Sequence, residues 1–486
     1  MMKLPMKQFE YSTPEPLHSA AASRLLEHNL ANTLPPHSLM QSAGLALARL
    51  ALALAPHAKT IWLACGPGNN GGDGIQAAVH LKQWGKQAVV SWLGHPDSAP
   101  ADAVLSCKRA KEAGVVFSET PPPSFDLCID ALLGIGPVRP PTGQLAQYLA
   151  LVNASTAPVL AVDLPSGLDP DTGDAPDWVI RAQHTLCLLS LKPGLFTAQG
   201  RDCTGALWFD PLGASTEARQ ASATAKLIGA PQIIRRNHHS HKGSYGDVAV
   251  IGGASGMTGA ALLAATAALY AGAGRVFVGL LDADMVADPV QPELMFRSID
   301  SLRLDAMTVV AGCGGGTAIQ SSLPQILSTA ARLVLDADGL NMLAQDSQLQ
   351  RQLRSRAKRQ RPTVLSPHPL EAGRLLGLTT PQIQADRLAA AQELADRFDC
   401  VVVLKGSGSV VASPNQLPAI NPSGCALLAT AGTGDVLAGL IGARLAAGQS
   451  AFQAACEAVY QHGLSADQWP QQQAFSASLL ARSLRP

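Results

Sequence analysis

The sequence lacks an excess of charge of either sign, since its 486 residues contain 36 Lys and Arg and 36 Asp and Glu. Without a basic stretch or tail, nucleic acid and anionic membrane surfaces are not expected as partners. Paired cysteines are lacking too, because the nine cysteines stand singly with no C-x-x-C spacing. In a chain of this length such cysteines indicate reduced, buried thiols, and we expect a cytoplasmic location.

Long apolar runs are lacking as well. The N-terminal stretch MMKLPMKQFEYSTPEPL has no apolar core of the kind that a signal peptide needs, so secretion is not expected. The most apolar helical stretch, LALARLALALA at residues 45–55, contains Arg49 and is too short to cross a bilayer. It predicts a buried or amphipathic helix. We expect small-molecule partners and a homo-oligomer.

The chain does have the length and apolar content for more than one core. Its hydrophobic share is 47% and its charged share 15%, which indicates two or three globular domains. Apolar β-type runs alternate with Ala- and Leu-rich helical runs, a pattern typical of a parallel, doubly wound α/β sheet. Residues 213–231 interrupt the alternation with small and polar residues and predict a linker. The predicted strands are residues 60–65, 88–93, 126–132, 159–165 and 184–189 before it, and 247–253, 275–281, 306–314, 332–338, 362–368 and 400–406 after it.

The stretch CGPGNNGGDGI at residues 65–75 joins the first of these strands to a predicted helix. Glycines let the backbone approach a phosphate closely, and the amides at a helix N-terminus attract anions. Gly66, Gly68 and Gly71 satisfy the G-x-G-x-x-G pattern of nicotinamide dehydrogenases, but the polar side chains beside them are not what that pattern needs. The alternative is a tight strand-to-helix turn with Asn in the left-handed conformation.

Two further predicted strands of the first half end in carboxylates. Asp130 ends one strand, and Asp163 ends the next, just before Ser166. Because the ends of parallel strands share one edge of a sheet, we expect these side chains to converge with Asn70. Their oxygens suit a hard cation, while Asp163 also suits a general base. The alternative is that each Asp only caps the next helix or turn.

These motifs together resemble the NAD(P)H-hydrate epimerase domain, through GPGNNGGDG, DALLGIG, DLPSGLDPDTG and LKPGL, with LMQSAG matching the helix before its first strand. The resemblance implies potassium at Asn70, Asp130 and Ser166, and catalysis by Asp163 with Lys192. It also implies binding of the damaged dinucleotide by Asn69, Asn70, Gly71, Gly72, Asp73, Gly134, Ile135, Gly136, Pro137, Val138, Arg139, Pro140 and Asp163. The chain departs from the family at Gln41 and Ser42, where Glu and Asn are frequent, and at Ile135, where Thr is common.

The second half contains no G-x-x-x-x-G-K-[ST] phosphate loop. Instead, ATAGTGDVLAG places Gly432 and Gly434 in a turn before an apolar helix, with Asp435 at the helix start. Backbone amides there form an anion hole, and a carboxylate beside it is placed to act as base when a hydroxyl attacks a phosphate. The alternative is an Asp that only caps a buried helix.

Other strand ends of the second half carry polar residues. Lys405 follows a fully apolar strand, and His368 lies between two prolines, although a lone His is more often structural than catalytic. AGCGGGT at residues 311–317 is another glycine loop after a strand. NHHSHKG at residues 237–243 suggests a metal cluster, but no further ligands follow at zinc-like spacing, which favours a polar lead-in loop.

These pieces resemble the ADP-dependent NAD(P)H-hydrate dehydratase domain, a relative of ribokinase-type kinases. The matching stretches are HKGSYGDVAVIGG, MTGAALLAA, DADGLN, PHPLEAGRL, LKGSGSVV and AGTGDVLAG. The resemblance implies ADP as phosphoryl donor with Mg²⁺, and Asp435 as the base. It places the hydrate at Ala260, Gly314, Gly316, His368 and Asp435, and the adenine nucleotide at Lys405, Gly406, Ser407, Gly408, Ser409 and Gly434. Leu370, Cys313 and Gly315 stand where the family usually has Gly, Pro and Leu.

Taken together, the resemblances imply a Rossmann-like three-layer α/β/α domain over residues 1–222 and a ribokinase-like α/β domain over residues 223–486. They imply an isomerase and lyase that epimerises the R and S hydrates, NADHX and NADPHX, and dehydrates the S form with ADP. One alternative is an oxidoreductase-type domain fused to a small-molecule kinase. Such a domain would need an acidic residue about twenty residues past the glycines, and Asp97 lies farther on. Another is a first half that only binds dinucleotides.

Overall fold

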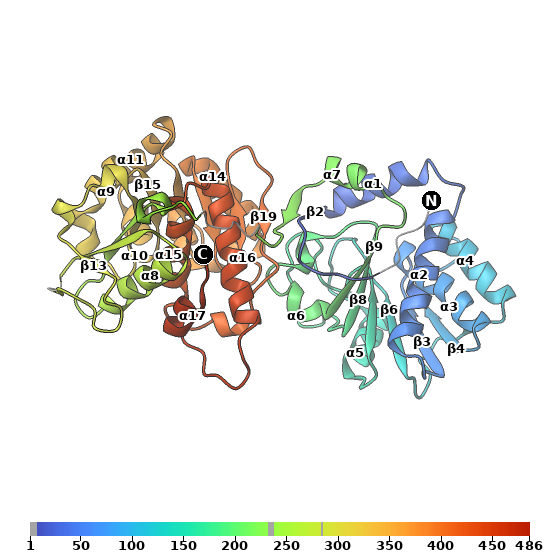
Figure 1. Ribbon diagram of the computed structural model, residues 1–486. Coiled ribbons are helices and arrows are strands. Elements are labelled where there is room, and N and C mark those ends of the chain that lie inside the picture. Colours follow the sequence, from blue (N-terminus) through green and yellow to red (C-terminus); the bar gives the residue numbers. More distant parts are fainter. Residues whose placement is uncertain (1–6, 232–237, 283–284) are drawn as a thin grey trace. The chain divides into compact units, whose positions relative to one another are not determined.

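The computed structural model in Figure 1 describes residues 7–231, 238–282 and 285–486. The chain divides into two compact units, one of Met1–Glu10 with Glu15–Ala225 and one of Tyr11–Pro14 with Lys226–Pro486. The sequence-based division falls between residues 222 and 223. Across the described ranges, no helix combines the length and the apolar character that crossing a membrane requires.

The first unit is built on an eight-stranded sheet in the order β1-β9-β8-β7-β6-β3-β4-β5. Neighbouring strands pair in parallel, apart from the antiparallel edge pair of β1 and β9. All five strands that the sequence predicts in this half are present. The strands are β1 (Lys7–Gln8), β3 (Thr60–Cys65), β4 (Gln87–Trp92), β5 (Val116–Phe117), β6 (Leu127–Ala131), β7 (Val159–Val162), β8 (His184–Leu188) and β9 (Ala206–Asp210), and β2 (Glu15–Leu17) lies outside this sheet.

Helices cover both faces of this sheet, and its strands are therefore buried on both sides. Successive side chains of a strand point to opposite faces, so Ile61 and Leu63 pack with α2 and α3 while Trp62 and Ala64 pack with α5. The apolar stretch at residues 45–55 lies in α2 and is buried along one side, as predicted. The helices are α1 (Ala20–Ala31), α2 (Ser38–Leu54), α3 (Asn69–Gln83), α4 (Ala101–Glu112), α5 (Gly143–Ala154), α6 (Gly200–Thr204) and α7 (Thr216–Ala221), with the 3-10 helix η1 (Pro193–Leu195).

The predicted linker is not unstructured. Its first part forms α7, which Ser215 caps by accepting a hydrogen bond from the Ala218 amide. Its second part forms β10 (Ala225–Leu227), which pairs in parallel with β19 (Ala419–Ile420). No periodic signal marks α7 in the sequence because the helix has only six residues and buries only Arg219.

The second unit has a sheet in which β13-β12-β11-β14-β15-β16-β17-β18-β19-β10 are successive neighbours. Pairing is parallel from β13 to β17 and antiparallel between β17, β18 and β19. All six predicted strands are present, and the predicted parallel α/β organisation is confirmed. The remaining strands are β11 (Asp247–Gly252), β12 (Arg275–Leu280), β13 (Met295–Phe296), β14 (Thr308–Ala311), β15 (Arg332–Leu335), β16 (Thr363–Leu365), β17 (Val401–Leu404) and β18 (Val410–Ala412).

Two helical layers again cover the sheet. Val248 and Val250 of β11 pack with α8, α15 and α16 on one face, while Ala249 and Ile251 pack with α9, α11 and α14 on the other. The helices are α8 (Thr258–Tyr270), α9 (Leu323–Thr329), α10 (Ala337–Gln345), α11 (Ser347–Lys358), α12 (Pro369–Leu376), α13 (Thr380–Ala385), α14 (Arg387–Phe398), α15 (Thr433–Ala446), α16 (Ala451–Asp467) and α17 (Ala477–Ser483), with 3-10 helices η2 (Lys242–Tyr245), η3 (Ile299–Ser301), η4 (Leu304–Ala306), η5 (Ala318–Ser321) and η6 (Ala426–Leu428).

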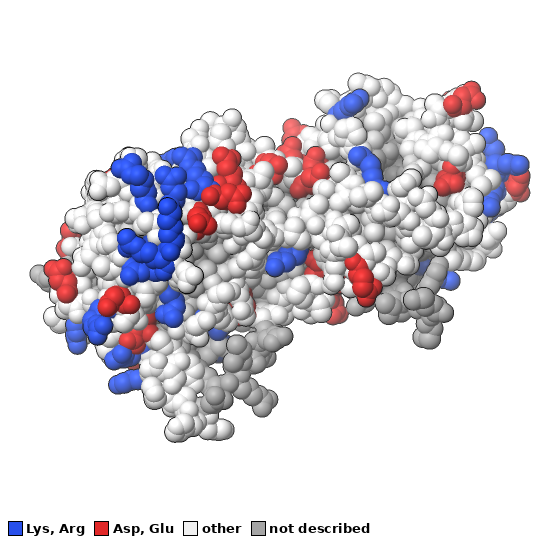
Figure 2. All heavy atoms as spheres, turned by 90° about the horizontal axis from the view of Figure 1, so that it is seen from above, with Lys and Arg blue, Asp and Glu red and all other residues white. Residues whose placement is uncertain are grey.

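Charge is unevenly distributed on the second unit despite the overall balance. Figure 2 shows Lys and Arg side chains gathered on the face of this unit that is turned to the viewer. Helix α11 has three exposed basic residues, Arg351, Arg354 and Lys358. Its buried residues Leu349 and Leu353 lie on the opposite side of the helix, so the basic residues form its solvated face.

Candidate functional site

The first unit contains a cavity of about 680 Å³ at the carboxyl ends of its parallel strands. Residues that follow β3, β6, β7 and β8 line it, which is where open α/β sheets bind ligands. Helix α1 and the turn before α2 also contribute to its wall. The predicted residues that line it are Asn69, Asn70, Asp73, Gly134, Ile135, Gly136, Pro137, Asp163 and Lys192.

The remaining predicted residues of this half lie elsewhere. Gly71 and Gly72 are buried packing positions, because a Cβ at Gly71 would lie 2.0 Å from the Gly66 carbonyl oxygen and one at Gly72 2.5 Å from Met40. The final residues of the predicted loop, Val138, Arg139 and Pro140, are not among those lining the cavity.

Asp163 and Lys192 form an ion pair on the cavity wall. The Lys192 ammonium also donates to the Leu188 carbonyl at 3.1 Å, and the Leu188 amide donates to Asp163 Oδ1 at 3.1 Å. Burial lowers the pKa of Lys192, but the charges of Asp163 and Cys187 outweigh it and the pKa is raised, so the ammonium persists. Among the described residues, the Lys192 ammonium and the Leu188 amide both bind Oδ1 of Asp163. Oδ2 of Asp163 is therefore the oxygen available to a substrate.

The backbone at Asp163 is held in an unusual conformation. Its φ of 67° lies in the left-handed region that non-glycine residues rarely adopt. Such strain is typical of functional positions, where the surrounding structure fixes the side chain in place.

Buried Asp130 and Ser166 lie behind the cavity, next to Asn70 on its wall, and the three form a cluster of polar groups. Ser166 Oγ donates to Asp130 Oδ1 at 2.6 Å, the Ser166 amide donates to Oδ2 at 2.8 Å, and Asn70 Nδ2 donates to the Leu133 carbonyl at 2.8 Å. Burial raises the pKa of Asp130 to about 6, although its hydrogen bonds with Ser166 act in the opposite direction. The three predicted side chains are therefore brought to one place, with oxygens that a hard cation prefers.

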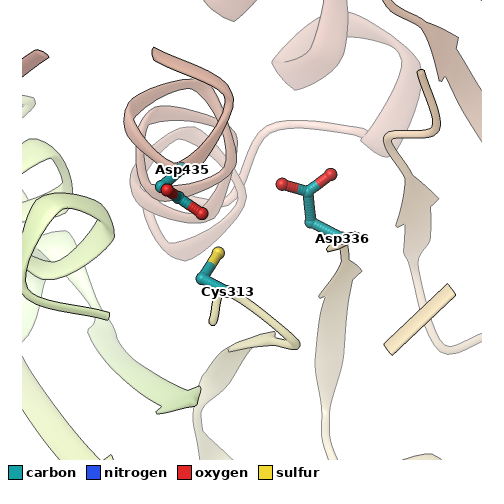
Figure 3. A group of neighbouring side chains, drawn as sticks. All are labelled: Cys313, Asp336 and Asp435. Atoms are coloured by element: carbon teal, nitrogen blue, oxygen red, sulfur yellow. The ribbon is translucent and has the colours of Figure 1, made fainter. Parts of the chain in front are cut away.

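In the second unit, polar side chains converge from the ends of four parallel strands. Cys313, Asp336, His368 and Lys405 each lie within three residues of the end of β14, β15, β16 or β17. Asp435 faces them from the first turn of α15. Figure 3 shows the Cys313 thiol and the carboxyls of Asp336 and Asp435 grouped together, and one ligand atom of each lies within 4.8 Å of the other two.

Lys405 connects this group to the N-terminus of α15. Its ammonium donates to Asp336 Oδ1 at 2.6 Å, and Ser366 Oγ donates to the same oxygen at 3.0 Å. Burial lowers the pKa of Lys405, but Asp336 and Glu371 outweigh it and raise the pKa. A Cβ at Gly434 would lie 3.5 Å from Lys405 Nζ, which places a fixed positive charge beside the amides of the helix start.

Asp435 has the environment of a general base that is active near neutral pH. Burial and the charge of Asp336 raise its pKa to about 6, against the opposing effects of the Cys313 hydrogen bond and Lys405. Behind it, His462 donates through Nε2 to the Thr433 carbonyl at 3.0 Å. Burial lowers the pKa of His462 to about 4, so it supports the glycine turn as a neutral imidazole.

His368 has a structural role that the sequence analysis kept as an alternative. It is the N-cap of α12, and its Nδ1 accepts hydrogen bonds from the amides of Leu370 and Glu371 at 3.1 and 3.3 Å. Its Nε2 lies 3.2 Å from Glu371 Oε1. Both ring nitrogens are therefore engaged by the helix start, while 45% of the side chain remains exposed.

The glycine loop after β14 contacts the start of α8. This contact is expected if Ala260, Gly314 and Gly316 belong to one binding site. The Ala254 amide donates to the Gly314 carbonyl at 2.7 Å, and a Cβ at Gly314 would lie 2.8 Å from the Cβ of Ala260. The Gly316 amide donates to Asp338 Oδ2 at 2.8 Å. Ala260, Gly314 and Gly316 thus lie in one region, and Asp338, which sequence analysis did not single out, holds the loop.

A buried arginine supports the loop of Lys405–Ser409. Arg387 Nη2 donates to the carbonyls of Leu404 and Lys405, both at 3.2 Å. Burial lowers the pKa of Arg387 to about 10. Gly406 has a φ of 138°, and a Cβ there would lie 2.9 Å from the guanidinium. The sequence offered no signal for Arg387, whereas Asp336 could have been found as an Asp at a strand end, like Asp130 and Asp163.

The structure describes only part of the histidine-rich stretch at residues 237–243 that suggested a metal cluster. Asn237 lies outside the described residues, while His241 caps η2 by accepting from the Gly243 amide at 3.1 Å. Within the part of the chain that the structure describes, Cys313, Asp336 and Asp435 are the group of side chains with metal-binding potential.

Two family models match the chain. The model described as NAD(P)H-hydrate dehydratase matches residues 248–485, and the model described as YjeF-related protein N-terminus matches residues 36–194. Together they cover both units.

Curated proteins match over most of the chain or over its second unit. The bifunctional NAD(P)H-hydrate repair enzyme Nnr of Escherichia coli (strain K12) is 35% identical, over 95% of this chain and 91% of its own. The ADP-dependent (S)-NAD(P)H-hydrate dehydratase of Neisseria meningitidis serogroup B is 44% identical, over 55% of this chain and 92% of its own. A crystal structure of a Bacillus subtilis ADP/ATP-dependent NAD(P)H-hydrate dehydratase, co-crystallised with ATP/Mg²⁺, is 30% identical, covers 51% of this chain and 91% of its own, and has a TM-score of 0.44.

Proposed function

The chain belongs to the family of bifunctional NAD(P)H-hydrate repair enzymes, and we propose that its first unit epimerises the hydrate while its second unit dehydrates it. As an enzyme it interconverts the R and S hydrates of NAD(P)H and converts the S hydrate to NAD(P)H. The observation that supports the assignment of sites is that each unit holds a carboxylate near a lysine, Asp163 paired with Lys192 and Asp435 acted on by Lys405.

In the first unit, the hydrate lies in the cavity with its nicotinamide ring at Asp163 and Lys192. The hydroxyl at C6 sits next to the ring nitrogen, so the hydrated ring is a hemiaminal. Asp163 accepts the hydroxyl proton and Lys192 keeps that carboxylate oriented. The dinucleotide is proposed to bind to residues 69–73 and 134–140. Support comes from the residues of these ranges that line the cavity, which are Asn69, Asn70, Asp73, Gly134, Ile135, Gly136 and Pro137.

Potassium is the cation proposed for the first unit. Asn70, Asp130 and Ser166 would hold it, since they combine a buried carboxylate with neutral oxygens. When bound, the ion supplies positive charge near the reacting ring and balances the buried carboxylate.

In the second unit, Asp435 is proposed to accept the proton of the C6 hydroxyl while the amides of Gly432–Gly434 and Lys405 bind the terminal phosphate of ADP. The oxygen attacks that phosphorus and AMP leaves. The ring nitrogen then expels phosphate from C6 and a proton leaves C5, which gives NAD(P)H. Phosphorylation matters because hydroxide is a poor leaving group. ADP as donor is supported by the name of the Neisseria relative.

Magnesium fits the acidic part of this site. Asp336 offers a hard oxygen ligand and leaves Asp435 to act as base, whereas burial raises the pKa of the Cys313 thiol well above its usual range, so it stays protonated and is a poor ligand. When bound, Mg²⁺ would neutralise phosphate charge.

The test is the absorbance of NAD(P)H formed from a mixture of R and S hydrates, with ADP and Mg²⁺ added or omitted. Conversion of the whole mixture is expected with ADP. Conversion of the S fraction alone would leave the dehydratase assignment and reduce the first unit to a binding module. Product with ATP and not with ADP would change the donor.

Two expectations stay predictions. Sedimentation of the full chain tests the expected homo-oligomer. Cell fractionation tests the expected cytoplasmic location.

A further inference from the structure

Helix α1 turns one side toward the cavity of the first unit. Ser23, Arg24, Glu27 and Ala31 line the cavity, and their spacing of three and four residues places them on a single face of the helix. Glu27 therefore lies on the wall that also carries Asp163 and Lys192. Neither the motifs nor the proposed mechanism uses this carboxyl.

Hydrogen bonds fix α1 against the loops that hold the catalytic pair. Ser23 Oγ lies 2.9 Å from Ser190 Oγ, two residues before Lys192. Arg24 Nη2 donates to the Ile135 carbonyl at 2.6 Å, within the glycine loop after β6. The Ala20 amide donates to Asp171 Oδ1 at 2.7 Å. The position of Glu27 over the cavity is thus set by contacts on both sides of the site.

The cavity places two of its carboxyls in different environments. Burial and then the charge of Asp163 raise the pKa of Glu27, against the opposing charges of Lys192 and Arg24. Asp163 instead pairs its Oδ1 with the buried Lys192 ammonium. Two titratable groups that their environments push apart are the arrangement of an acid and a base.

We propose that Glu27 is the proton donor that works with Asp163 in epimerisation, an inference that rests on the proposed placement of this reaction in the first unit. Asp163 takes the proton of the C6 hydroxyl, and the C6–N1 bond breaks with its electron pair going to N1. Glu27 gives its proton to N1, which leaves a C6 aldehyde on the opened ring. After rotation the N1 proton returns to Glu27, N1 attacks the other face of C6, and the oxygen takes its proton back from Asp163.

Three acidic residues besides Glu27 line the cavity, at Asp73, Asp102 and Asp163. Asp73 has its pKa raised well above the usual range by burial, with Glu27 as the first of the charges acting on it and Asp163 the second. Asp163 is the first of the charges acting on Glu27. Asp163 and Asp73 are thus the acidic groups that share the cavity wall with Glu27 and act on it or are acted on by it. Asp102 faces both Glu27 and Asp73 and is half-exposed.

The test compares Glu27→Gln with Glu27→Asp, with Glu112→Gln at an exposed acid of α4 as the matched control. Interconversion of the R and S hydrates is followed by NMR without ADP, and the spontaneous rate is subtracted. We expect Glu27→Gln to lower kcat by about 100-fold or more with little change in KM, since general acids contribute about 10²–10⁴-fold. Glu27→Asp should recover part of the rate. ADP-dependent dehydration of the S hydrate by the same chain should be unchanged.

A pH profile separates catalysis from structure. An acid works in its protonated form, so the wild-type rate should fall as pH rises through the raised pKa of Glu27. The Gln variant should lose that dependence. Asp163, Lys192, Arg24, Asp102 and Asp73 are the charged groups that face Glu27 and remain in both proteins.

Asp163→Asn, measured in parallel, distinguishes two failures. If Asp163→Asn loses epimerisation while Glu27→Gln keeps it within about twofold, the role of Glu27 is wrong and the proposed site stands. If both variants keep the rate, the site itself is wrong. A Glu27→Gln variant that loses activity only through a raised KM would show that Glu27 binds substrate and gives no proton.

Discussion

We propose Asp435 as the base of the second unit because of where its carboxyl lies. It sits at the start of α15, next to amides that bind anions, and faces Asp336 and the Cys313 thiol. An acidic residue in the first turn of a helix is ordinary. What makes Asp435 suitable as a base is its burial and the side chains at the strand ends opposite it.

At this scale we expect Asp435→Asn to abolish dehydration, with kcat reduced by about 100-fold or more because the general base is lost. Epimerisation should remain nearly intact, since Asp163 is in the other unit. Asp300→Asn, at an exposed acid of the second unit, is the control. Absorbance of NAD(P)H and NMR of the hydrates measure the two reactions. Equal loss of both in a folded variant would contradict the two-site assignment.

The pH dependence of dehydration follows from the same residue. A base works only when ionised, and the pKa of Asp435 is raised to about 6, chiefly by burial. We therefore expect kcat/KM to be high above this pH and to fall as pH decreases through it. Initial rates of NAD(P)H formation from the S hydrate between acidic and neutral pH give the profile. A rate independent of pH across this range would exclude Asp435 as the base.

At the scale of elements, the strand ends of the first unit build the cavity and the proposed cation site. Ser166, after β7, bonds to Asp130 at the end of β6. We expect replacement of potassium by sodium to slow epimerisation several-fold, because a buried carboxylate then has a poorly fitting counter-ion. Asp130→Asn should remove the difference between the ions. Rates in the two chloride salts at equal ionic strength test this, and equal rates for the wild type would remove the potassium assignment.

Helix α14 supports the loop of Lys405–Ser409, which we propose binds the nucleotide, through Arg387. We expect Arg387→Met to raise the KM for ADP about tenfold, or about 1.4 kcal/mol, because the carbonyls of Leu404 and Lys405 lose a charged donor. The free energy of unfolding should fall as well. Arg397→Met, at an exposed position of the same helix, is the control. An unchanged KM for ADP in a folded variant would show that the loop holds its shape without this support.

At the scale of the whole molecule, each unit has its own sheet, its own cores and its own candidate site. A mixture of the Asp163→Asn chain and the Asp435→Asn chain should therefore convert both hydrates to NAD(P)H, since the R hydrate epimerised by one chain diffuses to the other. Each variant alone should leave hydrate behind. Absorbance after long incubation measures the extent, and failure of the mixture would indicate that both sites must belong to one chain.

Much of this molecule was determined by the sequence itself. Fully apolar strands such as residues 401–404 predict a sheet buried on both faces, and the chain order of strands and helices predicts parallel pairing. Because parallel strands end at one edge, the positions of Asp130, Asp163 and Lys405 just at or after such strands were enough to group them into sites.

The tertiary structure decided what local pattern does not contain. The linker prediction missed α7 and β10 because short elements leave no periodicity, and β10 exists only through its pairing with β19. Glu27, Asp336 and Arg387 acquire their partners from residues distant in sequence, at Asp163, Lys405 and Leu404. Protonation state follows the same rule, since burial and neighbouring charge fix it, and both arise only when the chain is folded.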